Sequence, residues 1–163
     1  MEIAEDKDNQ HFIALARSAL CEVGLELHKG ASTVELARSA LTLFEEQEEI
    51  HWATNARAKR GAALCDRGEY AEGRELLETA LKRCIEDGIP AMIAYASFFL
   101  GRLELLDGRL ERAIERFNSC IDHYTKDEFE SMWTTARIYQ VWIGLLMGDS
   151  QTHRRTPDGD RGR

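Results

Sequence analysis

Hydrophobic side chains recur every three or four residues along most of the chain, which is the spacing of α-helices that bury one face. Only two prolines occur, so little in the sequence breaks long helices. The pattern predicts an all-α fold with seven helices, at residues 10–28, 33–47, 51–67, 70–86, 90–106, 109–124 and 128–147.

Glycine and proline mark the ends of these helices. Gly30, Gly68, Gly88 and Gly108 stand where a helix should stop, because glycine suits the left-handed residue that follows a last turn. Pro90 suits a first helical turn, where its missing N–H costs nothing. The connections are therefore short, and short connections predict consecutive helices that pack antiparallel as hairpins.

The sequence repeats itself along the chain. Residues 61–68 align with residues 101–108, so that the glycines at both ends superpose. The alignment continues into the following helices, where Gly73, Leu77 and Ala80 align with Ala113, Phe117 and Cys120. A weaker copy lies upstream around Gly24, and a fourth copy begins at Ala136 and stops at Gly148. Hairpins that repeat in this way stack to form one continuous core.

This pattern resembles the tetratricopeptide repeat, in which a small residue in the first helix is followed by Ala-x3-Phe in the second. Ala113 to Phe117 matches that template best, and the resemblance covers roughly residues 11–148. The period is longer than in the standard template and resembles repeats of kinesin light chains and of some large bacterial regulators. HEAT-type repeats share the longer period, but the paired glycines favour the tetratricopeptide pattern.

The resemblance implies a right-handed α-solenoid of about three and a half antiparallel hairpins, and a protein that binds other proteins. We expect the repeat domain to span residues 10–148, after an N-terminal extension at residues 1–9. Residues 149–163 contain no large apolar side chain, and we expect a disordered polar tail there.

Charge and cysteine content narrow the class of function. The chain has 163 residues and a net charge of −8. This charge argues against nucleic acid or an anionic membrane as partner. The N-terminus shows no signal peptide, and no apolar run approaches the roughly 18 residues of a membrane span. Four cysteines without a CxxC pair predict buried thiols in a reducing compartment. We therefore expect a cytoplasmic protein.

The sequence contains no complete enzyme motif. A phosphate-binding glycine loop and an HExxH motif are both missing. Cys120 and His123 lie on adjacent helical turns but lack a second pair of metal ligands. We expect no catalysis, no cofactor and no metal. The acidic run at residues 45–49 is interpreted as a solvated ridge, with a docking surface for a basic partner as the alternative.

The resemblance also implies a binding groove, because the first helix of each tetratricopeptide hairpin lines the concave surface. Counting from Gly61 and Gly101, the candidate residues for binding a peptide are Asn55, Lys59, Tyr95, Phe98, Arg102, Thr135, Tyr139 and Trp142. The same inward face also includes Ala58, Ala62, Asp66, Phe99 and Ile138. Tyr95, Phe98 and Trp142 would supply apolar anchorage. Asn55, Lys59 and Arg102 would fix the orientation of the peptide. The alternative is that these aromatic residues only pack between helices.

The last predicted helix, residues 128–147, carries apolar side chains around its whole circumference. A capping helix needs a polar outer face. This helix therefore predicts a partner, a homodimer formed through residues 128–147, or a sensor module within a larger regulatory protein. Arg57 and Arg60 occupy positions where the family prefers apolar residues, and we expect them to pair with Glu35 or Glu45.

Overall fold

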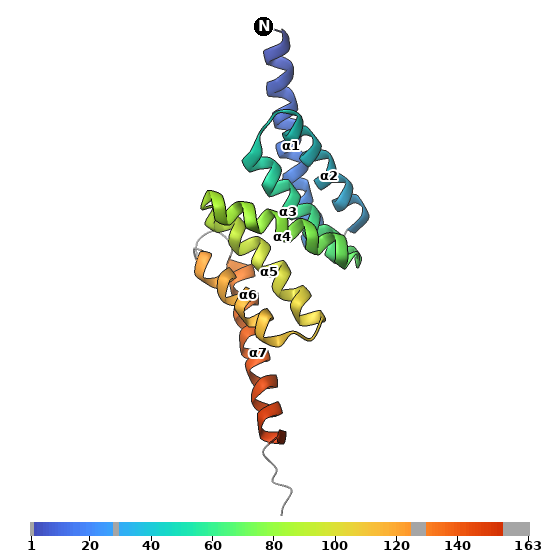
Figure 1. Cartoon of the computed structure of the whole chain (residues 1–163). Coiled ribbons are helices and arrows are strands. Elements are labelled where there is room, and N and C mark those ends of the chain that lie inside the picture. Colours follow the sequence, from blue (N-terminus) through green and yellow to red (C-terminus); the bar gives the residue numbers. More distant parts are fainter. Residues whose placement is uncertain (1, 28–29, 125–129, 155–163) are drawn as a thin grey trace, which may run out of the picture.

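The computed structural model describes residues 2–27, 30–124 and 130–154, and these form an all-α helical-repeat solenoid (Figure 1). Within these residues there is no strand. The helices are α1 (Glu2–Glu26), α2 (Gly30–Glu46), α3 (Ile50–Arg67), α4 (Tyr70–Asp87), α5 (Pro90–Leu106), α6 (Leu110–His123) and α7 (Glu130–Arg154). The all-α repeat fold predicted from the hydrophobic pattern is confirmed.

The two outer helices are longer than the sequence pattern indicated. Helix α1 begins at Glu2 and so includes most of the segment expected to be an N-terminal extension. Helix α7 continues to Arg154, beyond the expected start of the polar tail at residue 149. The remainder of that tail, residues 155–163, lies outside the described residues.

Consecutive helices pack as the hairpins α1–α2, α3–α4 and α5–α6, and α7 follows as an unpaired helix against α6. Helix α3 also contacts α1 and α5, so the first helices of the three hairpins lie beside one another. The molecule is elongated, and α1 and α7 project from its opposite ends (Figure 1).

The ends of the helices recur at a regular interval along the chain. Glu48, Gly68, Gly88 and Gly108 all have the left-handed backbone conformation, with φ values of 60°, 90°, 66° and 72°. The backbone N–H of the next residue donates in each case to the carbonyl of a residue in the last turn of the helix. At the end of α3, for example, Glu69 donates to Leu64 at 2.9 Å. Two helices that end in this way make one hairpin, which explains the period of the sequence repeat.

Small residues in the first helices allow the close packing that the repeat predicted. A Cβ built on Gly101 of α5 would lie 2.9 Å from Cε1 of Phe117 on α6, which is too close for a real side chain. Phe117 is completely buried, and so are Leu77 and Leu100 in the same core. The glycine thus provides the space into which the aromatic ring packs.

All four cysteines carry free thiols, and those of Cys21, Cys84 and Cys120 are buried. Burial raises the pKa of the Cys21, Cys65 and Cys84 thiols to about 11 and that of Cys120 to about 12. The thiols therefore stay protonated at neutral pH, where a reactive cysteine needs its thiolate.

The two unusual arginines of α3 both find carboxylate partners. Arg57 pairs with Glu45 of α2 at 2.6 Å, which is one of the two partners that the sequence suggested. Arg60 pairs instead with Glu72 of α4 at 2.7 Å. The suggestion for Arg60 was therefore wrong, because its side chain points across its own hairpin and not toward the preceding one.

Candidate interaction cleft

A cleft of about 490 Å³ lies between the first helices of the hairpins and α7. Its lining comes from α1, α3, α5 and α7, and consists of Glu22, Leu25, Glu26, Asp66, Tyr95, Phe98, Phe99, Arg102, Met132, Thr135 and Tyr139. The volume is within the range of pockets that bind small molecules or a few side chains of a partner.

Helix α5 supplies three aromatic side chains to the cleft lining, and these are largely buried, with 8% of Tyr95 and 7% of both Phe98 and Phe99 exposed. Tyr95, Phe98, Phe99 and Arg102 share one face of this helix because they stand at positions i, i+3, i+4 and i+7. The rings of Tyr95 and Phe99 are 5.0 Å apart between centroids, and those of Phe98 and Phe99 are 5.4 Å apart. The guanidinium of Arg102 lies 5.6 Å from the centroid of Phe99. These side chains therefore hold one another in place.

Helix α7 forms an uncharged wall of the cleft. Met132, Thr135 and Tyr139 lie on one helical face, at positions i, i+3 and i+7. The Tyr139 ring lies 6.4 Å from that of Phe98 and stacks on that of Phe117 at 4.9 Å. Tyr139 thus belongs partly to the core and partly to the cleft.

Helix α1 forms an acidic wall, with Glu22 and Glu26 on either side of Leu25. The ammonium group of Lys59 lies 2.7 Å from the Glu22 carboxylate and donates a hydrogen bond to the Ser18 hydroxyl at 2.8 Å. Lys59 is buried, so this contact fixes the Glu22 carboxylate at the edge of the cleft.

The hydroxyl of Tyr95 is buried and has no hydrogen-bond partner among the described residues. Only 8% of the Tyr95 surface is exposed, and burial holds the pKa of the phenol well above its usual value. A buried polar group without a partner is costly, and such a group in a cleft often bonds a ligand.

Five of the eight residues that the sequence suggested come together in this cleft: Tyr95, Phe98, Arg102, Thr135 and Tyr139. Phe99 and Asp66, which were assigned to the same inward face, also line it, whereas Ala58, Ala62 and Ile138 do not. The other three of the eight lie elsewhere. Asn55 donates to the sulfur of Met92 at 3.1 Å, and Lys59 is buried against α1. Trp142 is 47% exposed and does not line the cleft.

The sequence reasoning missed the contribution of α1 to the cleft. A signal for it exists, because Gly24 in the first hairpin corresponds to Gly61 in the second. In that alignment Glu22 and Leu25 take the positions that Lys59 and Ala62 take in the next hairpin. Counting inward positions from Gly24 would therefore have placed both residues at the cleft.

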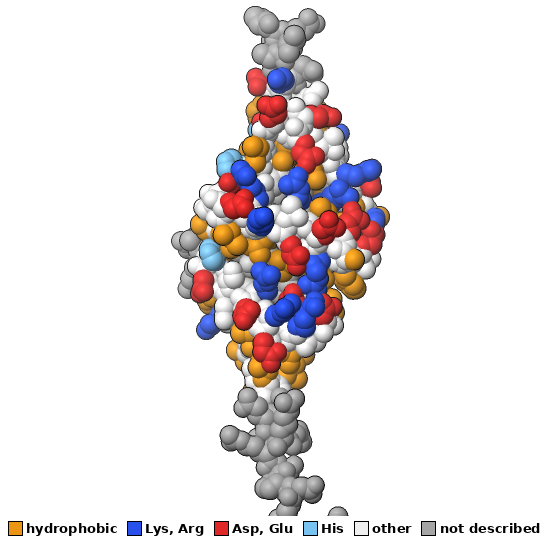
Figure 2. All heavy atoms as spheres, viewed as in Figure 1, with side chains coloured by type: hydrophobic (Ala, Val, Ile, Leu, Met, Phe, Trp, Pro, Cys, Tyr) orange, Lys and Arg blue, Asp and Glu red, His pale blue; other side chains and the backbone are white. Residues whose placement is uncertain are grey.

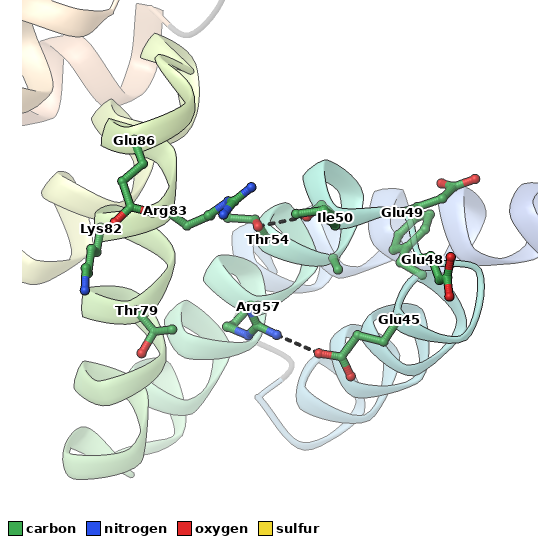
Figure 3. A pocket seen from close by; sticks show the side chains of 12 residues that line it. Glu45, Glu48, Glu49, Ile50, Thr54, Arg57, Thr79, Lys82, Arg83 and Glu86 are labelled. Atoms are coloured by element: carbon green, nitrogen blue, oxygen red, sulfur yellow. Dashed lines mark hydrogen bonds and ion pairs between the residues drawn. The ribbon is translucent and has the colours of Figure 1, made fainter.

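A second hollow, of about 460 Å³, lies between α2, α3 and α4 (Figure 3). Its labelled side chains are mainly charged, with Glu45, Glu48 and Glu49 on one side and Lys82 and Glu86 on α4 (Figure 3). Arg57 bonds Glu45 at 2.6 Å, and Phe44 beneath is completely buried. The lining of this hollow includes one aromatic side chain, that of Phe44, against four in the first cleft, so the first cleft is the stronger candidate.

The outer helices expose large apolar side chains. On α7 these are Ile138, Val141, Trp142, Leu145 and Leu146, and on α1 they are Phe12, Ile13, Leu20 and Val23, with Leu27 directly after its end. Figure 2 shows hydrophobic side chains gathered at the end of the molecule from which α7 projects. Charged side chains of both signs are interspersed over the centre of the same face (Figure 2).

These features define a helical-repeat protein with a cleft bounded by the first helices of its hairpins. Residues 49–126 match the family model of the tetratricopeptide repeat and belong to that family. No curated protein and no solved structure matches the chain. Tetratricopeptide repeats are generally protein–protein interaction modules.

In the part of the chain that the structure describes, no three side chains of the metal-ligating types gather at one place. None of its helices combines the length and the apolar character needed to cross a bilayer.

Proposed function

We propose that this chain is a non-catalytic interaction module that holds a peptide segment or helix of a partner protein in the cleft between α1, α5 and α7. One observation carries the proposal. Residues that the repeat pattern assigned to an inward face, from α3, α5 and α7, line one cleft with an aromatic surface. Rigid aromatic side chains in a concave site are typical anchors for protein partners.

Filling the cleft tests this proposal. The Thr135→Trp variant would place a large ring among the lining residues, whereas Thr134→Trp would place the same ring on the exposed side of α7. Affinity capture from the native cell extract, read by mass spectrometry, should lose its partners with Thr135→Trp and keep them with Thr134→Trp. Equal partner sets for the two variants, both shown to be helical by circular dichroism, would refute the cleft as the binding site.

The exposed row on α7 favours a second candidate function, self-association. Ile138, Val141, Trp142 and Leu145 stand at positions i, i+3, i+4 and i+7, so they form one apolar strip along the helix. Two antiparallel copies of such a strip would cover each other in a homodimer through residues 128–147. The proposal also covers a sensor module that dimerises in this way.

Sedimentation of matched variants separates this candidate from a monomer. Val141 on α7 is 65% exposed and Val23 on α1 is 51% exposed, so Val→Glu is a comparable change at both. Self-association through α7 predicts a wild-type dimer that Val141→Glu dissociates and Val23→Glu leaves intact. A wild-type monomer at all concentrations would exclude this candidate.

A further inference from the structure

The charged side chains that line the cleft are mostly acidic. Glu22 and Glu26 of α1 and Asp66 of α3 bring three carboxylates to its lining, whereas Arg102 brings one cation. Lys59 offsets the charge of Glu22, and the described α7 residues of the lining include no ionisable side chain except the phenol of Tyr139. An incoming segment therefore meets an acidic wall on one side and an uncharged wall on the other.

The one cation of the lining is already engaged. Arg102 lies over the ring of Phe99, where the face of the ring attracts it. An acidic partner at Arg102 would also meet the carboxylates of Glu22 and Glu26 in the same cleft. A basic partner meets no such obstacle, because Lys59 is buried behind the acidic wall.

The Tyr95 hydroxyl provides a second and independent sign of a ligand. It is a buried polar group at the lining of the cleft, and no described residue bonds it. A neutral phenol can accept a hydrogen bond from an N–H donor. Such a donor on the ligand would satisfy the acceptor side of a hydroxyl that no described residue bonds.

We infer that the cleft takes a short apolar segment of a partner protein that carries a lysine or arginine beside its apolar anchor. The anchor packs on Phe98, Phe99 and Tyr139, the cation pairs with the carboxylate of Glu26 beside the Glu22–Lys59 ion pair, and an N–H of the segment donates to the Tyr95 hydroxyl. This inference rests on the proposed function, and it adds the chemistry of the partner.

A random peptide library, displayed and selected on the full chain, tests the inference without a known partner. The selection is run on the wild type and on the Thr135→Trp variant. Peptides that only the wild type enriches should combine an apolar side chain with an excess of Lys and Arg over Asp and Glu. Cleft-dependent peptides that are neutral or acidic would overturn the inference and leave the proposed cleft standing. No cleft-dependent peptide at all would overturn both.

Charge reversal then locates the contact for one enriched basic peptide. Glu26→Lys should weaken its binding about tenfold, and added salt should weaken binding to the wild type, because the pairing is electrostatic. Glu115→Lys makes the same change on the exposed surface of α6, away from the cleft. It should leave the affinity within about twofold. Equal effects of the two substitutions would overturn the contact.

The Tyr95→Phe variant separates a ligand contact from a structural role. It removes only the unpartnered hydroxyl, so the unfolding free energy should stay the same or rise. The affinity for the basic peptide should nevertheless fall about fivefold, because the peptide N–H loses its acceptor. A variant that binds as tightly as the wild type would exclude the hydroxyl as a ligand contact.

Discussion

Gly61 and Gly73 face each other where α3 crosses α4, and each lies against the carbonyl oxygen of the other. A Cβ built on Gly61 would be 2.9 Å from the Gly73 oxygen, and one built on Gly73 would be 2.8 Å from the Gly61 oxygen. The side chains of Leu77 and Cys65 also lie in the way, but a shift of these side chains would still leave a backbone oxygen on each side. The two helices can therefore approach this closely only because both residues lack a side chain.

We expect the Gly61→Ala variant to be destabilised by about 1–3 kcal/mol, because the added methyl group pushes α3 and α4 apart. Urea unfolding measures the change. Gly144→Ala on α7 is the matched control, since nothing lies within 4 Å of its Cβ position. There the same substitution should raise stability by about 0.5–1 kcal/mol through helix propensity alone. A loss at Gly144 comparable to that at Gly61 would contradict the packing argument.

Four of the described helix ends have a left-handed residue, and Glu48 is the one among them that is not glycine. This exception gives a second prediction. Glu48 has a φ of 60°. This conformation costs a residue with a Cβ about 1–2 kcal/mol. We expect Glu48→Gly to raise the unfolding free energy by about 1 kcal/mol. Gly68→Ala should lower it by a similar amount, although no atom lies within 4 Å of the added methyl group. Thermal unfolding of the two variants should therefore shift in opposite directions.

The helical frame was predictable from the sequence because its signals are local. Apolar periodicity and the glycines at positions 68, 88 and 108 each act within one or two turns, so they indicate helix ends without knowledge of the fold. The start of α1 was missed because residues 2–9 are mostly charged and show no apolar period.

The candidate site was predictable only as far as the repeat holds. Thr135 and Tyr139 stand one repeat after Tyr95 and Phe99 and line the same cleft. Trp142 has the same relation to Arg102 but is 47% exposed and does not line the cleft. The burial of Lys59 depends on Ser18 in another hairpin, and no local pattern indicates such a contact.

A buried carboxylate provides a third prediction. Glu104 of α5 is buried and accepts hydrogen bonds from Arg74 of α4 at 2.8 Å and from Arg109 at 2.5 Å. Arg74 also reaches Asp107 at 2.6 Å, so the network joins the second hairpin to the third. Glu104→Gln keeps the shape but removes the charge between two guanidinium groups.

This substitution leaves the half-buried Arg74 without its full counter-charge. We expect Glu104→Gln to destabilise the protein by roughly 1–3 kcal/mol, the cost of a buried hydrogen-bonding group that loses its partner. Glu115 on α6 is exposed and serves as the control. Glu115→Gln should leave the stability essentially unchanged, as is usual for a surface substitution. Chemical denaturation of both variants at neutral pH measures the difference. If Glu104→Gln and Glu115→Gln had equal unfolding free energies, the ion-pair network would contribute nothing to the packing of the second hairpin on the third.

The raised thiol pKa values predict a loss of stability in alkaline solution. The ordinary thiol pKa is 9.0, and burial raises it to about 11 for Cys21, Cys65 and Cys84. Between these values the unfolded chain releases thiol protons that the folded protein keeps. The unfolded state then binds fewer protons, so the unfolding free energy falls as the pH rises. The contribution is complete below pH 9.0 and is lost through about pH 11.

Urea unfolding at a series of pH values should therefore show a steep decline above pH 9.0. Each thiol contributes up to about 1.4 kcal/mol per pH unit in this window. Cys84→Ala removes one titrating group, so its stability should decline less steeply than that of the wild type, whatever its stability at neutral pH. Parallel declines in the two proteins would show that the Cys84 thiol ionises equally in the folded and unfolded states, and that its burial does not suppress the thiolate.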